Sequence, residues 1–227
     1  MKPILFNTTM VKAILEGRKV ATRRSINVNN ELDFIGFVTC STQKEHEGAG
    51  AFGKGSFKDI VNAKIQEYKK PPYQVGDILY VRETWCDTNK DLVKNSKLDI
   101  GGCQFIFKVD DNGKKQPLVE MDVKRWRPSI HMPRIAARIF LKVTDIRAER
   151  LQDMEEQDFF KEGIREFTKD GIVKKYDVEP FMHKWSDMPR SIDLAFKHLW
   201  DSTVQKGKFT NLWDNNPWVW VIEFKKL

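Results

Sequence analysis

The predicted strands are unevenly spaced along the chain, and this spacing limits the folds that it can adopt. Runs typical of strands lie at residues 19–24, 78–85, 104–109, 137–145 and 217–224, and helical patterns separate only some of them. A doubly wound parallel sheet needs a helix after nearly every strand. The pattern instead predicts an α+β fold, a mixed β-barrel of five to six strands decorated with helices and loop insertions.

The first predicted helix leads directly into a basic segment. Apolar residues at 11, 14 and 15 share one face of this helix, Thr8 or Thr9 can cap its start, and Gly17 suits its end. The basic residues that follow, 19–24, are therefore expected to leave a helix end in an extended conformation.

Two further helices are predicted in the second half of the chain. Asp153 and Glu156 match a capping box, and Gly163 is expected to end the helix that they begin. Residues 192–203 place apolar side chains on one face at helical spacing.

Three segments look like insertions into a single domain that covers residues 1–227: those near 26–72, 87–125 and 165–190. The glycine-rich stretch 48–55 is predicted to be a loop, and it lacks the Gly-Lys-Ser/Thr ending of a phosphate-binding loop. A turn is predicted at Asp111-Asn112-Gly113.

Composition indicates a globular protein, with 41% hydrophobic and 31% charged residues. The formal net charge of +7 mildly favours polyanionic partners. The three cysteines form no CxxC pair, so no zinc site is expected. Their odd number and the lack of a signal peptide at residues 1–6 predict a cytoplasmic protein. No run approaches the ~20 apolar residues of a membrane span.

The basic segment after the first helix is the first candidate site. Lys19, Thr22, Arg23 and Arg24 gather a lysine, a hydroxyl and two guanidinium groups within six residues. Such a group can hold an anion or polarise a carbonyl, and a desolvated lysine can activate a neighbouring hydroxyl as a nucleophile. A solvated basic turn is the alternative interpretation.

Glu162, at the predicted end of the second helix, is a candidate acid. The helix dipole disfavours a negative charge there, and burial would raise the pKa of the carboxyl group further. A surface glutamate on a charged helix is the alternative.

Two more segments are candidates for contacts with bases and phosphates. Residues 126–134 form a proline-fixed loop, and aromatic and guanidinium planes stack on bases while arginines hold phosphates; its candidate residues are Trp126, Arg127, His131 and Arg134. A core tryptophan with a solvated basic loop is equally compatible, and His131 has no partner at metal-ligand spacing. At the end of the strand 78–85, the candidates are Arg82, Glu83 and Trp85. The indole of Trp85 would line a base pocket.

Residues 17–24 also resemble the GxKxxTxR signature of ASCH domains, which belong to the PUA-like superfamily. The downstream order is similar: a Gly76-Asp77 turn with a strand, the strand 139–145, a helix ending at Glu162-Gly163, and a last strand 220–224. The enlarged form, with the motif YVRETW at residues 80–85 and the loop at 126–134, looks like the version found in bacterial prophages and phages. Val20 departs from the family pattern, where many members have threonine.

The resemblance implies a PUA-like β-barrel that binds RNA, DNA or a modified nucleoside. Small bacterial members are similar to amidohydrolases that remove the acyl group from N4-acetylcytidine without metal or cofactor. Carried over to this chain, Lys19 is the general base, Thr22 the nucleophile and Glu162 the acid. Two hypotheses follow: a deacylase of this kind, or a non-catalytic module that reads RNA or DNA through the basic and aromatic candidates above.

Overall fold

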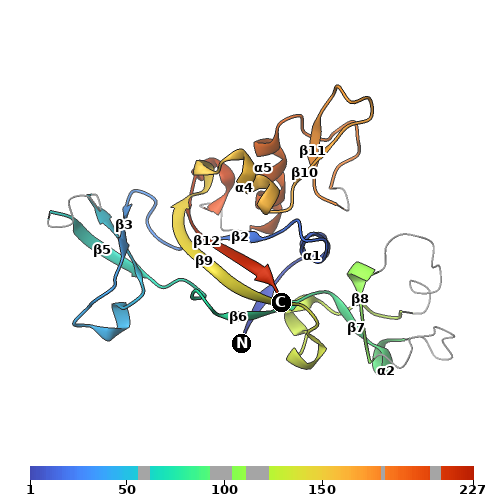
Figure 1. Cartoon of the computed structure of the whole chain (residues 1–227), viewed down its shortest axis with the longest axis horizontal. Helices are drawn as coiled ribbons and strands as arrows, with labels where there is room; N and C mark the ends of the chain where they lie inside the picture. The colour runs from blue at the N-terminus through green and yellow to red at the C-terminus, as the bar shows by residue number, and fades with distance from the viewer. Residues whose placement is uncertain (56–61, 93–103, 111–122, 180–181, 205–210) are drawn as a thin grey trace.

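A computed structural model describes residues 1–55, 62–92, 104–110, 123–179, 182–204 and 211–227 (Figure 1). A five-stranded sheet forms its centre, in the order β1-β6-β9-β12-β2. β1 and β6 are parallel, and the other neighbours are antiparallel. The bounds are β1 Lys2–Leu5, β2 Ala21–Ser25, β6 Ile78–Arg82, β9 Phe140–Arg150 and β12 Trp218–Lys226.

The strand β12 lies inside the sheet and is buried on both faces. Trp220 and Ile222 belong to one apolar cluster, and Val219 and Val221 belong to a second cluster on the opposite face. This alternation explains why a run rich in tryptophan and valine forms a central strand. The predicted last strand is thereby confirmed.

The helix α1 Thr8–Leu15 precedes β2 (Figure 1). Its cap is Asn7, whose side-chain oxygen accepts a hydrogen bond from the Met10 amide at 2.8 Å, so the predicted cap at Thr8 or Thr9 was wrong by one or two residues. Gly17 adopts a φ of 73°, the left-handed conformation expected after a helix. The chain then turns into β2, as the sequence predicted.

The second face of the sheet carries α4 Glu156–Lys161, α5 Ile192–Thr203 and a hairpin of β10 Arg165–Phe167 and β11 Lys175–Asp177 (Figure 1). The predicted capping box was wrong, because Asp153 belongs to a 3-10 turn, η6 Leu151–Asp153, and α4 begins at Glu156. Burial of Leu151 in the core holds this turn in place. Gly163 ends the helix with a φ of 103°, and α5 has the predicted bounds.

A three-stranded antiparallel sheet occupies the predicted insertion near 26–72, with the order β3-β4-β5. Its strands are β3 Asp33–Phe37, β4 Gly50–Lys54 and β5 Lys64–Lys69. The loop prediction for residues 48–55 was wrong, because β4 is the middle strand. A Cβ atom at Gly50 would lie 2.7 Å from Cη2 of Trp220, and one at Gly53 would lie 2.1 Å from the Lys64 carbonyl oxygen. Glycine therefore permits a close approach here rather than a turn.

Replacing Gly53 by alanine is expected to lower the free energy of unfolding by about 1–3 kcal/mol, because the added Cβ forces β4 and β5 apart. Urea denaturation monitored by tryptophan fluorescence measures the change. Lys54→Ala, at the exposed end of the same strand, is the control. An unchanged midpoint for the Gly53 variant would contradict the close approach.

The predicted insertion near 87–125 contributes a two-stranded sheet of β7 Trp85–Asp87 and β8 Phe105–Phe107, with the short helix α2 Thr88–Asp91 beside it. The strand predicted at 104–109 is confirmed for three residues, after which η3 Lys108–Asp110 begins. The turn predicted at Asp111-Asn112-Gly113 lies outside the described residues. Four further 3-10 turns are present in the described part: η1 Lys44–His46, η4 Ser129–His131, η5 Arg134–Ala136 and η8 Trp213–Asn215.

The architecture is mixed α+β, as predicted. β1 and β2 are the edges of the central sheet, so the described residues contain no closed barrel. Within the same residues, no helix is long and apolar enough to cross a membrane.

Candidate functional site

Lys19 and Glu162, which are 143 positions apart, meet in the interior. The Lys19 side chain is 0% exposed and that of Glu162 is 4% exposed. The ammonium Nζ of Lys19 donates a hydrogen bond to the Glu162 main-chain oxygen at 3.0 Å and another to the Glu162 carboxylate. The two candidates from the basic segment and from the helix end therefore form one buried ion pair.

The ends of α1 and α4 bring this pair together. The Val20 amide donates to the Lys161 carbonyl oxygen at 3.0 Å, and the Arg18 guanidinium donates to that of Gly163 at 3.1 Å. A Cβ atom on Gly163 would lie 3.1 Å from Cβ of Ala13. The glycine thus allows the end of α4 to pack closely against α1 and to present the Glu162 side chain to Lys19.

Arg23 adds a second buried cation to the same site. Its guanidinium lies 3.4 Å from Oε1 of Glu162, 2.6 Å from Oε1 of Glu149 and 3.2 Å from Oδ2 of Asp158. The Arg23 side chain is 0% exposed. Two cations and three carboxylates therefore form a connected network that joins β2 and the residues before it to β9, to α4 and to the residue that follows α4.

Burial lowers the pKa of Lys19 below its ordinary value of 10.5, and the neighbouring Glu162 carboxylate opposes this effect. The positive charges of Arg24 and Arg23 lower the pKa further. A neutral amine is therefore more accessible at Lys19 than at an exposed lysine.

Thr22 lies in β2 opposite Ile222 of β12 and is 2% exposed. Among the described residues, its hydroxyl has no hydrogen-bond partner. Alternation along the strand puts Thr22 and Arg24 on one face. Lys19 Nζ and Arg24 Cζ lie 5.7 Å and 5.5 Å from the centroid of the same Phe6 ring.

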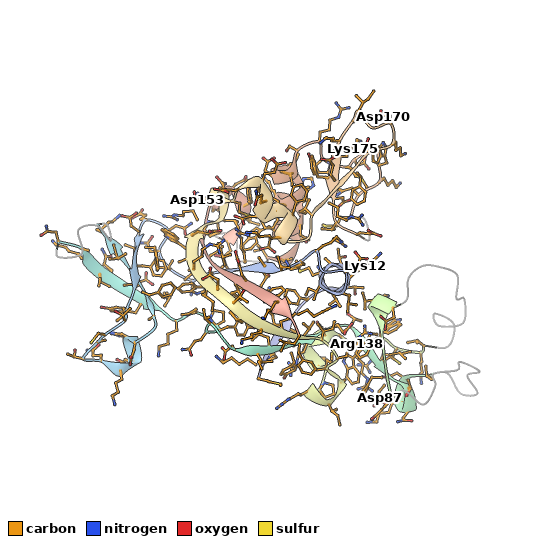
Figure 2. All side chains as sticks on the ribbon, viewed as in Figure 1. Lys12, Asp87, Arg138, Asp153, Asp170 and Lys175 are labelled. Atoms are coloured by element: carbon orange, nitrogen blue, oxygen red, sulfur yellow. The ribbon has the colours of Figure 1, made fainter. Side chains whose placement is uncertain are left out.

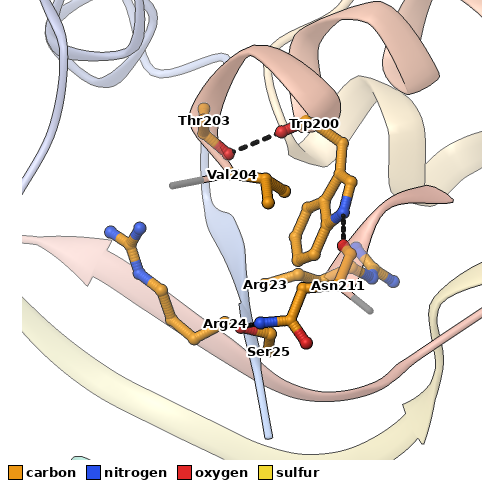
Figure 3. Close-up of a pocket in the computed structure, with 7 residues that line it drawn as sticks. All are labelled: Arg23, Arg24, Ser25, Trp200, Thr203, Val204 and Asn211. Carbon is orange, nitrogen blue, oxygen red and sulfur yellow. Dashed lines mark hydrogen bonds between the residues drawn. The ribbon is translucent and has the colours of Figure 1, made fainter. Parts of the chain in front are cut away.

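Two cavities border β2, and Arg24 lines both. One of about 220 Å³ lies between β2 and the end of α5, and Figure 3 shows Arg23 and Arg24 pointing to opposite sides of the strand there. The other, of about 400 Å³, lies towards residues 69–73. Lys19, Thr22 and Glu162 line neither cavity.

The candidates at the end of β6 lie outside the Lys19–Glu162 site and contact different residues. Glu83 is buried and bonds Arg138 at 3.0 and 2.9 Å, and burial raises the pKa of Glu83 although Arg138 opposes the rise. Arg82 donates to the Ile130 carbonyl oxygen at 3.2 Å. Trp85 is 4% exposed, with the Phe105 ring edge-on to it at 5.6 Å, so core packing covers the indole that we expected to line a base pocket.

The loop at 126–134 also lies on this side. Arg127 bonds Asp91 at 3.0 Å, and Lys108 lies over the Trp126 ring at 5.8 Å. His131 and Arg134 are exposed in the turns η4 and η5. Figure 2 shows Arg138 and Asp87 below the central sheet and Lys175 above it. In the described part of the chain, none of these candidates shares a hydrogen bond or an ion pair with the Lys19 site.

The sequence interpretation missed Glu149 and Asp158 as partners of Arg23. Asp158 and Glu162 are four residues apart and therefore share a face of α4. This spacing was the one feature of the sequence that could have predicted Asp158 as a member of the site. Among the described residues, no group of three or more His, Cys, Asp or Glu side chains could hold a metal ion.

Cys86 offers a test of burial on the β7 side. Burial, together with Asp91 and Asp87, raises the pKa of its thiol to about 11. Cys40 is exposed. We therefore expect iodoacetamide at pH 8 to alkylate Cys40 and to leave Cys86 unmodified until denaturant is added, as measured by peptide mass spectrometry. Equal labelling of both thiols in the native protein would contradict this packing.

Comparisons of the chain with protein-family models, curated proteins and solved structures give no match. The resemblance to ASCH domains therefore stays a prediction, which rests on the signature at residues 17–24 and on the order of the elements that follow it.

Proposed function

We propose that the chain is a PUA-like ASCH protein that acts in the cytoplasm and hydrolyses the amide of an N4-acylated cytidine or a related modified nucleoside. The observation that carries the proposal is the buried contact between Lys19 and Glu162, with Thr22 three residues further on and its hydroxyl unbonded in the described part. A nucleophile, a base and an acid are the groups that amide hydrolysis requires.

The proposed reaction proceeds in two stages. The Thr22 oxygen attacks the acyl carbonyl while Lys19 accepts the hydroxyl proton. The tetrahedral intermediate then breaks its C–N bond, and the nucleoside amine leaves with a proton from Glu162. Water hydrolyses the resulting threonine ester, which releases the carboxylic acid and restores the hydroxyl.

The ion pair can supply the two proton-transfer groups in one step. Transfer of a proton across the Lys19–Glu162 hydrogen bond converts ammonium and carboxylate into a neutral amine and a carboxylic acid. Burial favours the neutral amine, because desolvation lowers the pKa of Lys19. Arg23, beside Glu162, contributes a fixed positive charge to the same site.

Access is the structural requirement of this proposal. Lys19 and Thr22 are covered, so substrate must displace side chains to reach the hydroxyl. The Phe6 ring lies beside both Lys19 and Arg24, so it is one side chain that this displacement would involve. A closed site of this kind excludes water from the acyl intermediate until the amine has left.

The experiment is incubation with N4-acetylcytidine and chromatographic detection of cytidine. The proposal expects turnover without added metal, abolished in Lys19→Ala. Lys12→Ala, an α1 lysine that pairs with Glu179 at 2.9 Å outside the site, is the matched control and should retain activity. Absence of cytidine with N4-acetylcytidine and with longer N4-acyl chains would remove the deacylase proposal.

A non-catalytic module that reads RNA or DNA is the second candidate. The observation in its favour is the Arg24 guanidinium, which lines two cavities and makes no ion pair with any described residue. Oligonucleotide binding without turnover, unaffected by Lys19→Ala, would favour it. Arg134→Glu tests the loop at 126–134, because Arg134 is exposed and free of carboxylate partners in the described part.

A further inference from the structure

The larger cavity beside β2 has a cationic and aromatic wall. It measures about 400 Å³, which falls within the range of small-molecule sites. Its lining comes from the end of β2 and the residues after it, from the end of β5 and the segment that follows, and from β12, and none of these residues is acidic. The cationic and aromatic members are Arg24, Lys69, Lys70, Tyr73 and Trp220.

Two of the three cations in this wall make no ion pair with the described residues. The Arg24 guanidinium donates one hydrogen bond to the Leu5 carbonyl oxygen at 2.8 Å and makes no ion pair in the described part of the chain. Lys70 is exposed and likewise makes none there, whereas Lys69 lies 2.8 Å from Glu67. Burial holds the pKa of Arg24 below its ordinary value, and the opposing effects of Tyr73 and Glu162 do not restore it.

The cavity is also larger than an anion alone would need. Tyr73 is fixed by the hydrogen bond that its hydroxyl donates to the Pro3 carbonyl oxygen at 2.8 Å. Trp220 forms another part of the wall. Aromatic side chains beside a guanidinium suit a ligand that has both a flat or apolar part and a negative charge.

The cavity adjoins the proposed reaction site. Thr22 and Arg24 point to the same face of β2, and two residues along a strand span about 7 Å. From this arrangement we propose that the substrate carries a phosphate group, held by Arg24 and Lys70 in the 400 Å³ cavity while the acylated base reaches Thr22. The inference rests on the proposed function and narrows its substrate from a nucleoside to a nucleotide or a nucleotide unit of a strand.

Isothermal titration calorimetry at low salt can test this with cytidine, cytidine 5′-monophosphate, inorganic phosphate and a ten-nucleotide oligocytidine RNA. We expect the monophosphate to bind at least about tenfold more tightly than cytidine, because a charge-assisted contact to phosphate adds roughly that factor. If the source is a strand, the RNA should bind more tightly still, with a salt slope of about −0.7 per phosphate contact.

Variants assign the effect to the cavity. Arg24→Gln and Lys70→Gln should each remove most of the preference for the phosphorylated ligand, and Lys225→Gln, an exposed lysine on β12 that does not line the cavity, should keep it. If Arg24→Gln fails to fold, Lys70→Gln decides the question. Equal affinity for cytidine and its monophosphate would overturn the inference. A preference for the monophosphate that survives in Lys70→Gln would also overturn it, whether or not Arg24→Gln folds.

The two proposals fail in different ways. A phosphate preference that depends on Arg24 and Lys70, without hydrolysis of any N4-acylcytidine, would keep the phosphate site and remove the deacylase. Hydrolysis of N4-acetylcytidine at equal efficiency with and without a 5′-phosphate, together with equal binding, would keep the deacylase and remove the phosphate site.

Discussion

Replacing Glu162 by leucine is expected to lower the free energy of unfolding by about 3–5 kcal/mol. Among the described residues, Lys19 would retain only the Glu162 main-chain oxygen as a partner for its ammonium group, and its fully buried charge would lose its carboxylate. Arg23 would lose one of three carboxylates and keep Glu149 and Asp158. Urea denaturation followed by fluorescence of the seven tryptophans measures the loss.

The double variant Lys19→Met with Glu162→Leu is the control for this prediction. Removing both charges leaves no unpaired ion, so most of the stability should return. Glu162→Leu within about 1 kcal/mol of the wild type would show that the two side chains are not a buried pair in solution.

Replacing Thr22 by valine is expected to reduce deacylation by about 10³-fold or more while the fold is retained. Valine has nearly the shape of threonine and lacks only the hydroxyl, which makes no hydrogen bond among the described residues. The strand pairing opposite Ile222 should therefore survive. Initial rates of cytidine release and the thermal unfolding midpoint are measured on the same preparation.

Thr22→Ser separates the hydroxyl from the packing of the side chain. Serine retains the nucleophilic oxygen, so this variant should recover a large part of the activity that valine loses. A Thr22→Val protein that still hydrolyses N4-acetylcytidine at the wild-type rate would exclude Thr22 as the nucleophile.

The elements with the strongest periodicity were predictable from the sequence. The helix at 192–203 has its predicted bounds because its apolar face packs on the sheet, and β12 follows from its run of β-forming residues. β1 and the β3–β4–β5 sheet were not predicted. The glycines of β4 indicate a loop by local rules, and only the close approach of Lys64 and Trp220 explains them.

The site was predictable only in part. From local sequence alone, Lys19 could be a solvated basic residue and Glu162 a surface glutamate. Only the resemblance to ASCH domains predicted that the two act in one site. In the structure the two side chains are in contact. The carboxylates around Arg23 come from β9 and α4, so no local pattern could assemble them. The sequence around Trp85 does not distinguish a ring that stacks on a base from a ring in the core, and in the structure this ring packs in the core.

The central claim, that Thr22 attacks an acylated base with help from Lys19 and Glu162, is tested most directly by trapping the ester. The protein is mixed with N4-acetylcytidine, quenched in acid within the first turnover and digested for peptide mass spectrometry. The account predicts an acetyl group on Thr22 that is absent from Thr22→Val. Cytidine release with acetylation at another residue, or with equal modification in the valine variant, would contradict it.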